Sequence, residues 1–368
     1  MNLFLKILIA LSLFTAIFIE LPKFSSKFDY QKTRNDFDNS PYVLGNNYKT
    51  IIHDENFDAV NGYMYVSQTE MNKTVYDHPP FGKFLIGLSI LLTGNQNIIQ
   101  IFVSFFTLVA FYYLSKDLLK SQTLALFSSL ILSLEPLFRE QVSTSLLDQD
   151  LLLLLTLALL STLKSLKNRK WIIASLISLG FFSSIKFPAN SVVLITTIFI
   201  FYLLLQRSDL IKAFIKYFII IPIIYFILYI PFIDKPSLAK FIDLQIFAAK
   251  WHKSHLPDYP KFEIFRLMIF NSWRTWWGAE PFVKVPYFHF GWPLSFMSLI
   301  LVFFQKLTQE IKLIIIWCLL YLALSSLRVV FPRYLLLLLP FLYLILIYLI
   351  YGCWCRWKRS KHRSESRQ

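Results

Sequence analysis

Two short segments carry the side chains best suited to chemistry. The first is His53-Asp54-Glu55, and about twenty-five residues later the run from Tyr76 to Lys83 reads YDHPPFGK. An adjacent pair of carboxylates can supply a general base and a group that orients it. The two prolines stiffen the second segment, because the residue before a proline is driven out of the helical region. Alone, an acidic pair in a polar loop is more often part of a solvated surface.

The composition indicates what surrounds these segments. The 368 residues are 56% hydrophobic and only 16% charged, whereas soluble domains average about 25% charged residues. Disorder is excluded by 37 Phe, 19 Tyr and 9 Trp. The three cysteines, Cys318, Cys353 and Cys355, form neither a disulfide framework nor a CxxC metal motif. The net charge of +15 therefore indicates a lipid bilayer with anionic headgroups as the partner, and no nucleic acid.

Apolar runs of roughly 17–25 residues are typical of membrane-spanning helices. We predict an all-α integral membrane protein, a single membrane domain over residues 1–368, built from about ten such helices. Phe84–Leu92 is too short to span and is predicted to be interfacial or re-entrant. The ten predicted spans are Leu3–Ile19, Ile98–Leu114, Leu124–Phe138, Leu146–Leu163, Trp171–Ile185, Ser191–Leu205, Phe214–Phe232, Trp292–Phe304, Leu313–Leu327 and Tyr334–Tyr351.

The distribution of Lys and Arg supports this count. Four short connections and the tail at residues 356–368 are basic, and with ten spans all of them fall on one side. The positive-inside rule makes that side cytoplasmic, so both termini are predicted to be cytoplasmic, in the cell (plasma) membrane. The first apolar run could instead be a signal peptide, but it lacks a small-residue cleavage site. The tail is interpreted as a patch against the inner leaflet.

Two long segments then lie on the outer face. The first outer loop, residues 20–80, carries the acidic pair, and the second covers residues 234–291. Both are too polar to span and rich in aromatic residues, so we expect short amphipathic helices on the membrane surface. Trp273, Trp276 and Trp277 in the second loop are interpreted as an interfacial aromatic belt rather than a sugar platform.

Cations also occur at the outer ends of the predicted helices, where no orientation signal requires them. Ionisable groups at membrane depth are candidates for function, although each one alone could simply extend its head to the interface. Together they suggest a bound anion, and a phosphate fits because Arg and Lys are its usual ligands. The four cations are Arg139, Lys186, Arg328 and Arg333.

Asp54-Glu55 followed by the run from His78 to Lys83 resembles the first outer loop of the protein O-mannosyltransferases and their relatives. These are GT-C-type membrane glycosyltransferases that use a polyprenyl-phosphate sugar. Weaker matches follow in order along most of the chain: Ser145-Leu146-Leu147-Asp148, the segment from Gly180 to Lys186, Trp251-His252 with His255, Trp276-Trp277, Trp292-Pro293-Leu294, and Phe331-Pro332-Arg333-Tyr334 with Pro340. The last also resembles the aminoarabinose transferases.

The chain departs from the family pattern in two respects. The family commonly has an arginine shortly before its LLD motif, where this sequence has Ser143-Thr144-Ser145, and Arg139 one helical turn earlier could replace it. The large lumenal domain that the fungal and animal enzymes insert in the second loop has no room here.

The resemblance implies transfer of a sugar, with mannose favoured, from a polyprenyl- or dolichyl-phosphate donor to a Ser/Thr hydroxyl of a protein on the outer face. A lipid or a cell-envelope glycan is the alternative acceptor. Asp54 would be the general base of one inverting displacement and Glu55 would orient it. A flippase for the same lipid-linked sugar is a competing class, and a structural scaffold would explain neither the outer cations nor the Pro-Pro turn.

The remaining roles follow from this scheme. Lys186 and Arg333, with Arg139 and Lys83, are predicted to bind the donor phosphate, and His78, Asp148 and His252 are predicted to position the substrates. The histidines at 53, 78, 252, 255 and 289 could gather a divalent cation, but no HExxH or clustered spacing supports a metal site. No cofactor is firmly implied.

Overall fold

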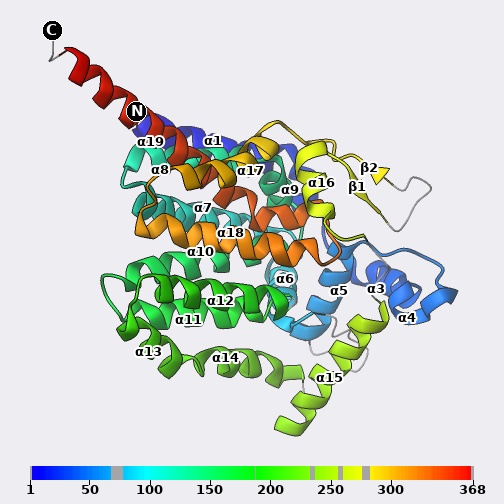
Figure 1. The fold of residues 1–368 in the computed structure, drawn as a ribbon. Helices are drawn as coiled ribbons and strands as arrows, with labels where there is room; N and C mark the ends of the chain where they lie inside the picture. Colours follow the sequence, from blue (N-terminus) through cyan, green and yellow to red (C-terminus); the bar gives the residue numbers. More distant parts are fainter. Residues whose placement is uncertain are drawn as a thin grey trace.

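The computed structural model describes residues 2–67, 78–186, 188–232, 237–255, 260–275 and 282–365. Most of these residues form a bundle of apolar helices that lie side by side (Figure 1). The bundle comprises α1 (Asn2–Ile19), α7 (Ile98–Leu119), α8 (Gln122–Leu134), α10 (Leu147–Ser165), α11 (Trp171–Ser183), α12 (Pro188–Leu204), α13 (Ser208–Tyr217), α14 (Ile220–Tyr229), α17 (Gly291–Leu301), α18 (Gln309–Ser326) and α19 (Leu339–Glu365).

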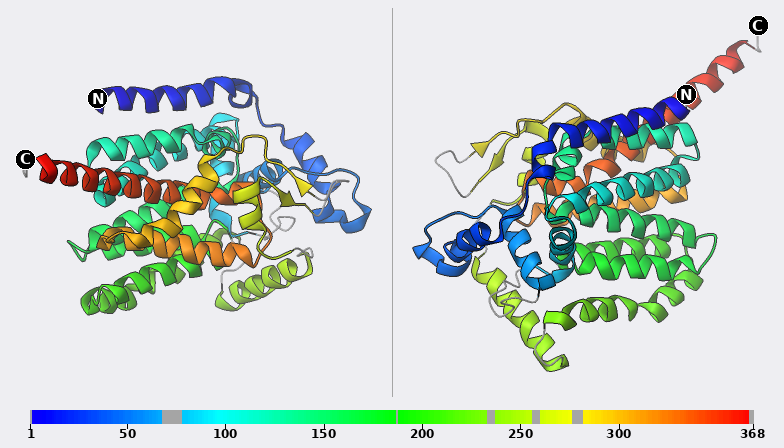
Figure 2. Two further views of the ribbon diagram at one scale, coloured as in Figure 1. Left: turned by 45° about the horizontal axis from the view of Figure 1, so that its top comes forward. Right: turned by 180° about the vertical axis from the view of Figure 1, so that it is seen from behind.

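Shorter elements gather at one end of this bundle (Figure 2). From the first predicted outer loop come α2 (Leu21–Ser25), α3 (Tyr30–Asp38), α4 (Pro41–Leu44), η1 (Gly45–Asn47) and α5 (Asp54–Ser67), followed by α6 (Pro80–Thr93). The second contributes α15 (Leu238–His255), α16 (Glu263–Phe270), β1 (Trp273–Arg274) and β2 (Phe282–Val283). The strands pair antiparallel, with Trp273 opposite Val283. The beginning of α1 and the end of α19 lie at the opposite end of the bundle (Figure 2).

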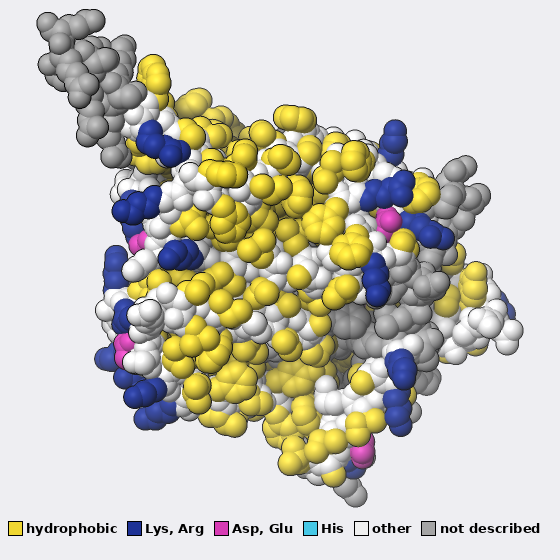
Figure 3. All heavy atoms as spheres, in the orientation of Figure 1, with side chains coloured by type: hydrophobic (Ala, Val, Ile, Leu, Met, Phe, Trp, Pro, Cys, Tyr) yellow, Lys and Arg dark blue, Asp and Glu magenta, His cyan; other side chains and the backbone are white. Residues whose placement is uncertain are grey.

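The outer surface of the bundle is apolar. A broad hydrophobic band covers the face in Figure 3, and Lys and Arg side chains flank it at both edges. On α7, for example, Phe102, Phe105 and Phe106 are exposed. A soluble monomer rarely exposes such a continuous apolar surface, and lipid is the solvent that suits it. The protein is a multi-pass membrane protein.

Within the described ranges, five helical segments are long and apolar enough to cross a membrane, and a sixth results if α9 (Pro136–Val142) and α10 count as one bent span. The other apolar helices are shorter. The ten predicted spans all fall on helices, but the count of ten stays a prediction.

Two predicted spans need correction. The segment Leu124–Phe138 is not continuous, because α8 ends at Leu134 and Pro136 begins α9, which is bent by 113° from α10. Glu135 is extended, as expected before a proline. The last predicted span does not begin as an α-helix at Tyr334: the 3₁₀ helix η5 (Pro332–Leu337) comes first, and α19 starts at Leu339.

A pair of glycines lets α5 and α6 pack backbone against backbone. A Cβ atom on Gly87 would collide with the carbonyl oxygen of Gly62, and one on Gly62 would collide with the carbonyl oxygen of Lys83. Close approach of this kind needs residues without side chains. The contact fixes α5, which begins at Asp54, against α6, which carries Lys83.

Candidate active site

Asp54, the predicted base, begins α5 and pairs with an arginine near the end of the chain. The Nη2 atom of Arg333 donates to Oδ2 of Asp54 at 2.5 Å, and its Nε atom lies 3.3 Å from Oδ2 of Asp148. Asp148 lies in the first turn of α10, where the helix dipole favours a carboxylate. The Nζ atom of Lys186 donates to both oxygens of Asp148, at 2.8 and 3.0 Å. Four predicted site residues therefore form one chain of alternating charge.

The ring of Tyr334 lies among three cations. Its centroid is 4.8 Å from Nζ of Lys186, 4.9 Å from Cζ of Arg328 and 5.8 Å from Cζ of Arg333. The negative face of an aromatic ring attracts such charges. We call these residues, together with Asp54 and Asp148, the charged cluster. It holds three cations against two carboxylates.

Each of the two arginines of the charged cluster has one buried N–H group that donates to none of the described residues. Arg328 donates to Oδ1 of Asn190 at 2.8 Å and to Oη of Tyr321 at 2.9 Å. The Nε atom of Arg328 is buried and has no hydrogen-bond acceptor among the described residues, and the buried Nε atom of Arg333 faces Asp148 at 3.3 Å without making a hydrogen bond. A buried N–H group without an acceptor is costly. An anion bound here would satisfy both.

The carboxyl group of Asp54 is held in its ionised form. Burial raises its pKa, but the charge and hydrogen bond of Arg333 lower it, and Lys186 and His78 add to that lowering, so the pKa lies below the ordinary value of 3.8. Since only one Asp54 oxygen accepts from Arg333 and the side chain is 41% exposed, the carboxylate can still accept a proton from a substrate.

Three motifs that are far apart in the sequence meet beside this cluster. The backbone N–H of Phe81 donates to the carbonyl of Ser184 at 2.9 Å, and the rings of Phe81 and Phe181 lie 4.8 Å apart. A Cβ atom on Gly82 would lie 2.6 Å from Leu147, the residue before Asp148. The Pro-Pro turn, the start of α10 and the end of α11 are therefore packed together.

The other predicted site residues do not belong to the charged cluster. Lys83 is fully buried, with its ammonium 4.7 Å from the ring centroid of Phe57. Glu55 contributes its backbone carbonyl, which accepts from Ser145 at 3.5 Å. Arg139 is half-buried on α9 and pairs with none of the described residues. The side chain of His252, on α15, lies outside the described part of the chain.

A second polar centre was not predicted from the sequence. The buried carboxylate of Glu135 accepts from Tyr343 at 2.5 Å and Trp292 at 3.2 Å, and its Oε2 atom lies 3.1 Å from Nε2 of His289. The backbone N–H of Gly291 donates to Nδ1 of His289 at 3.2 Å, so Nε2 carries the proton and donates to Glu135. An acidic residue inside an apolar run was the signal that could have revealed this centre.

Potential metal ligands do not gather in this part of the protein. Over the described ranges, no group of three His, Cys, Asp or Glu side chains is placed to hold a metal ion.

Fold and site together define the class: a membrane helix bundle in which an acid at the start of α5 faces cations at the ends of bundle helices. Comparison with known proteins confirms the resemblance seen in the sequence. Residues 77–233 match the family model described as dolichyl-phosphate-mannose-protein mannosyltransferase. No curated protein sequence matches the chain.

Solved structures show the same fold. The structure of ArnT from Cupriavidus metallidurans bound to undecaprenyl phosphate superposes with a TM-score of 0.58 at 14% identity, covering 79% of this chain and 54% of that one. The structure of the same protein in the apo state superposes with a TM-score of 0.55 at 13% identity, covering 81% of this chain and 54% of that one. The chain thus spans about half the length of these relatives, and the likeness concerns the fold alone.

Proposed function

We propose that the protein is an inverting glycosyltransferase that moves a sugar from a polyprenyl-phosphate donor to an acceptor hydroxyl on the outer face of the membrane. The observation that carries this proposal is the pairing of Asp54 with Arg333, beside buried arginine N–H groups that make no hydrogen bond to any described residue. The matched family model and the undecaprenyl phosphate in the similar structure support the donor class.

The reaction is a single displacement. The acceptor oxygen attacks the anomeric carbon while the bond from that carbon to the phosphate oxygen breaks, and the acceptor proton passes to Asp54. Polyprenyl phosphate leaves as an anion, so no general acid is required. Positioned acid–base groups typically contribute about 10²–10⁴-fold, and the remainder comes from alignment of the two substrates and from cations at the departing phosphate.

Arg333 and Arg328 are the proposed phosphate ligands. Lys186 has both Asp148 oxygens as partners, so its proposed role changes from direct ligand to support: it holds Asp148, which in turn faces Arg333. Lys83 remains a candidate ligand of the donor phosphate. Arg139 stays a candidate on α9, and His78 and Asp148 position the groups around them.

The lipid chain of the donor needs an apolar path close to these cations. An apolar cavity of about 610 Å³ lies between α16, α17 and α18, lined in part by Phe265, Phe296 and Leu327. Leu327 immediately precedes Arg328. A carrier that places its isoprenoid chain in this cavity would bring its phosphate to the arginines.

Mannose is the proposed sugar, because the matched family is described by that donor. The same description favours a Ser/Thr hydroxyl of a protein as acceptor, and a lipid or cell-envelope glycan is the alternative. We place the charged cluster on the outer face of the cell membrane, with both termini cytoplasmic, as the basic connections predict.

The test uses purified full-length protein in nanodiscs with radiolabelled polyprenyl-phosphate mannose or glucose. Wild type should transfer label to an acceptor, and Asp54→Asn should abolish transfer while it still binds the donor. Donor movement across a vesicle membrane without transfer would support a flippase instead. Equal turnover in Asp54→Asn would remove Asp54 from the mechanism.

A further inference from the structure

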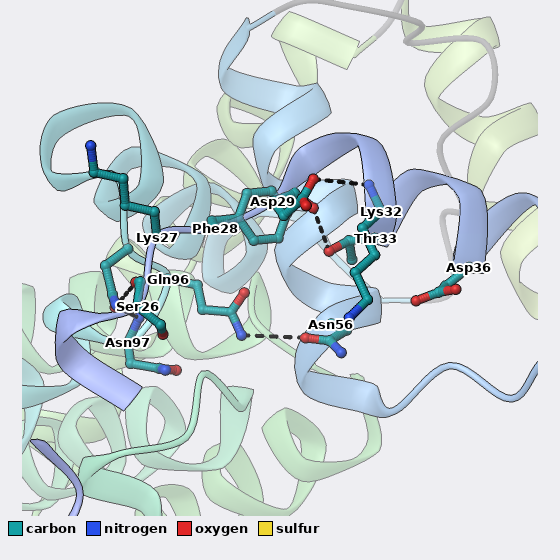
Figure 4. Close-up of a pocket in the computed structure, with 11 residues that line it drawn as sticks. Ser26, Lys27, Phe28, Asp29, Lys32, Thr33, Asp36, Asn56, Gln96 and Asn97 are labelled. Carbon is teal, nitrogen blue, oxygen red and sulfur yellow. Dashed lines mark hydrogen bonds between the residues drawn. The ribbon is translucent and has the colours of Figure 1, made fainter. Parts of the chain in front are cut away.

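A polar pocket lies against the first turn of α5, the helix that begins with the candidate base. Its volume is about 210 Å³, below the roughly 300–1,000 Å³ of pockets for drug-sized ligands. Figure 4 shows the lining side chains, which come from the link before α3, from α3 and α5, and from the link between α6 and α7. The space suits a ligand fragment about as large as one sugar ring.

The charge of the pocket indicates a neutral ligand. Lys27 and Lys32 line it together with Asp29 and Asp36, so the cations and carboxylates are equal in number. This balance contrasts with the charged cluster, where three cations face two carboxylates. A phosphate would gain nothing here from an excess of positive charge. The pocket is therefore distinct in chemistry from the proposed donor site.

Its polar groups offer both donors and acceptors to a ligand. The Asp36 carboxylate has no partner among the described residues, and the Oδ1 atom of Asn97 is buried and without a hydrogen bond there. Gln96 donates to Asn56 at 3.5 Å, a long hydrogen bond that a ligand can replace (Figure 4). Hydroxyl groups, which donate and accept at once, satisfy such a mixture.

One aromatic side chain completes the lining. Phe28 is half-buried, and its backbone N–H donates to the carbonyl of Gly94 at 2.8 Å, which fixes its position. Asn95 holds the same link by donating to the carbonyls of Lys23, Phe24 and Ser26. A pyranose ring presents C–H groups that pack on an aromatic face and hydroxyls that face polar side chains. An extended peptide would instead use a strand edge or an apolar groove, and this pocket provides neither.

We infer that this pocket binds a saccharide unit of the acceptor, which makes a glycan the substrate class rather than a bare protein hydroxyl. The inference rests on the proposed function and chooses between its two acceptors. Asn56 lines the pocket two residues after Asp54 in the first turn of α5, so the two side chains leave the helix in different directions. A saccharide bound here would hold the acceptor by a unit remote from the reacting hydroxyl, and binding energy from such a non-reacting part of a substrate can be used at the reacting centre.

Direct binding tests the pocket without any need for transfer. Saturation-transfer NMR is recorded on full-length protein in nanodiscs with α-1,6-mannobiose, maltose and chitobiose. At least one disaccharide should bind to wild type and equally to Asp54→Asn, with affinity reduced about tenfold in Asp36→Asn and in Lys32→Ala. Lys49→Ala, an exposed lysine of the same outer segment outside the pocket, should bind as wild type does. Absence of binding by all three probes, or binding unaffected by Asp36→Asn, would overturn the inference.

The transfer assay then separates the two proposals. With the bound disaccharide as acceptor, Asp36→Asn should raise the KM for the acceptor about tenfold and leave kcat and donor binding unchanged. Transfer only to a serine-containing peptide would refute the saccharide pocket while preserving the glycosyltransferase. Saccharide binding without transfer to any acceptor would refute the proposed function but not the pocket.

Discussion

Arg333 and Asp54 form an ion pair across 279 residues of sequence, with 2.5 Å between Nη2 and Oδ2. The pair joins the segment that precedes the last helix to the first turn of α5. Since Arg333 also faces Asp148, its guanidinium fixes the distance between a candidate base and a buried structural carboxylate. A planar group with five N–H donors suits this bridging position better than a lysine would.

Replacing Arg333 should therefore reduce catalysis more than it reduces folding. Arg333→Ala is expected to lower kcat/KM for transfer by about 10²–10³-fold, the usual effect of removing one preorganised charge-stabilising group. Arg333→Lys should recover only part of the activity, because one ammonium cannot reproduce the planar fork. Arg207→Ala is the matched control, since Arg207 pairs with Asp209 in a short connection between bundle helices. A fall of similar size in that variant would show that the effect is not specific.

The lowered pKa of Asp54 predicts a pH profile. Because the pKa of the Asp54 carboxyl lies below its ordinary value of about 4, the carboxyl stays ionised at that pH. Protonation of Asp54 should therefore not reduce transfer until the pH falls below that ordinary value. In Arg333→Gln the lowering charge is gone and burial, which raises the pKa, remains. The acid limb of log kcat/KM should then move to higher pH. An unchanged acid limb in that variant would mean that Arg333 does not control the base.

Asp148 and Lys186 are expected to matter for stability. Their side chains are 1% and 7% exposed, so Asp148→Asn leaves a buried ammonium without its counter-charge, at a cost of about 3–5 kcal/mol. Thermal unfolding in detergent, followed by tryptophan fluorescence, should show a lower Tm. The double variant Asp148→Asn/Lys186→Met should recover part of the loss because it removes the unpaired charge. Failure to recover would place the cost elsewhere.

The glycine contact between α5 and α6 gives a separate test. Gly87→Ala places a methyl group against the backbone of Gly62, which forces the helices apart and should lower both Tm and transfer activity. Leu92→Ala, at a 73% exposed position of the same helix, serves as the control and should change neither measurably. Wild-type behaviour of Gly87→Ala would mean that α5 need not approach α6 so closely.

Replacing one carboxylate oxygen of Glu135 should lower the stability of the protein. Glu135→Gln keeps the size of the side chain but turns one acceptor into an N–H donor toward its three donor partners, which should cost about 1–3 kcal/mol. Glu140→Gln is the comparison, because that exposed side chain accepts from Tyr287 at 2.9 Å and from no other residue that the structure describes. Denaturation midpoints of the two variants should therefore differ. Equal midpoints would argue against a structural role for Glu135.

Much of the site could be predicted from the sequence, because charged residues are rare in this chain and conspicuous at the ends of apolar runs. Lys186 and Arg333 were identified in this way, Asp54 came from the acidic pair in the first outer loop and Asp148 from a motif that resembles the mannosyltransferases. The structure brings all four together. The pairing itself could not be predicted. Lys186 was expected to contact phosphate, and only the packing of α11 against α10 reveals that Asp148 holds it.

The residues that escaped prediction share a physical reason. Gly62 and Gly87 are important because they have no side chain, which lets the two helices approach closely. Tyr334 was noted as part of a motif, without a role of its own. Their importance depends on neighbours from other helices, which hydropathy does not encode. The bend at Pro136 was similarly hidden, because the apolar run continues through Phe138 although the backbone turns.

The order in which the partners of the ion pair are synthesised has a consequence for biogenesis. A ribosome makes Asp54 279 residues before Arg333, so a chain interrupted between them carries the acid without the guanidinium that lowers its pKa. The ion pair can form only after η5 has been synthesised. A product that terminates before η5 would therefore lack the pair and leave the charged cluster incomplete.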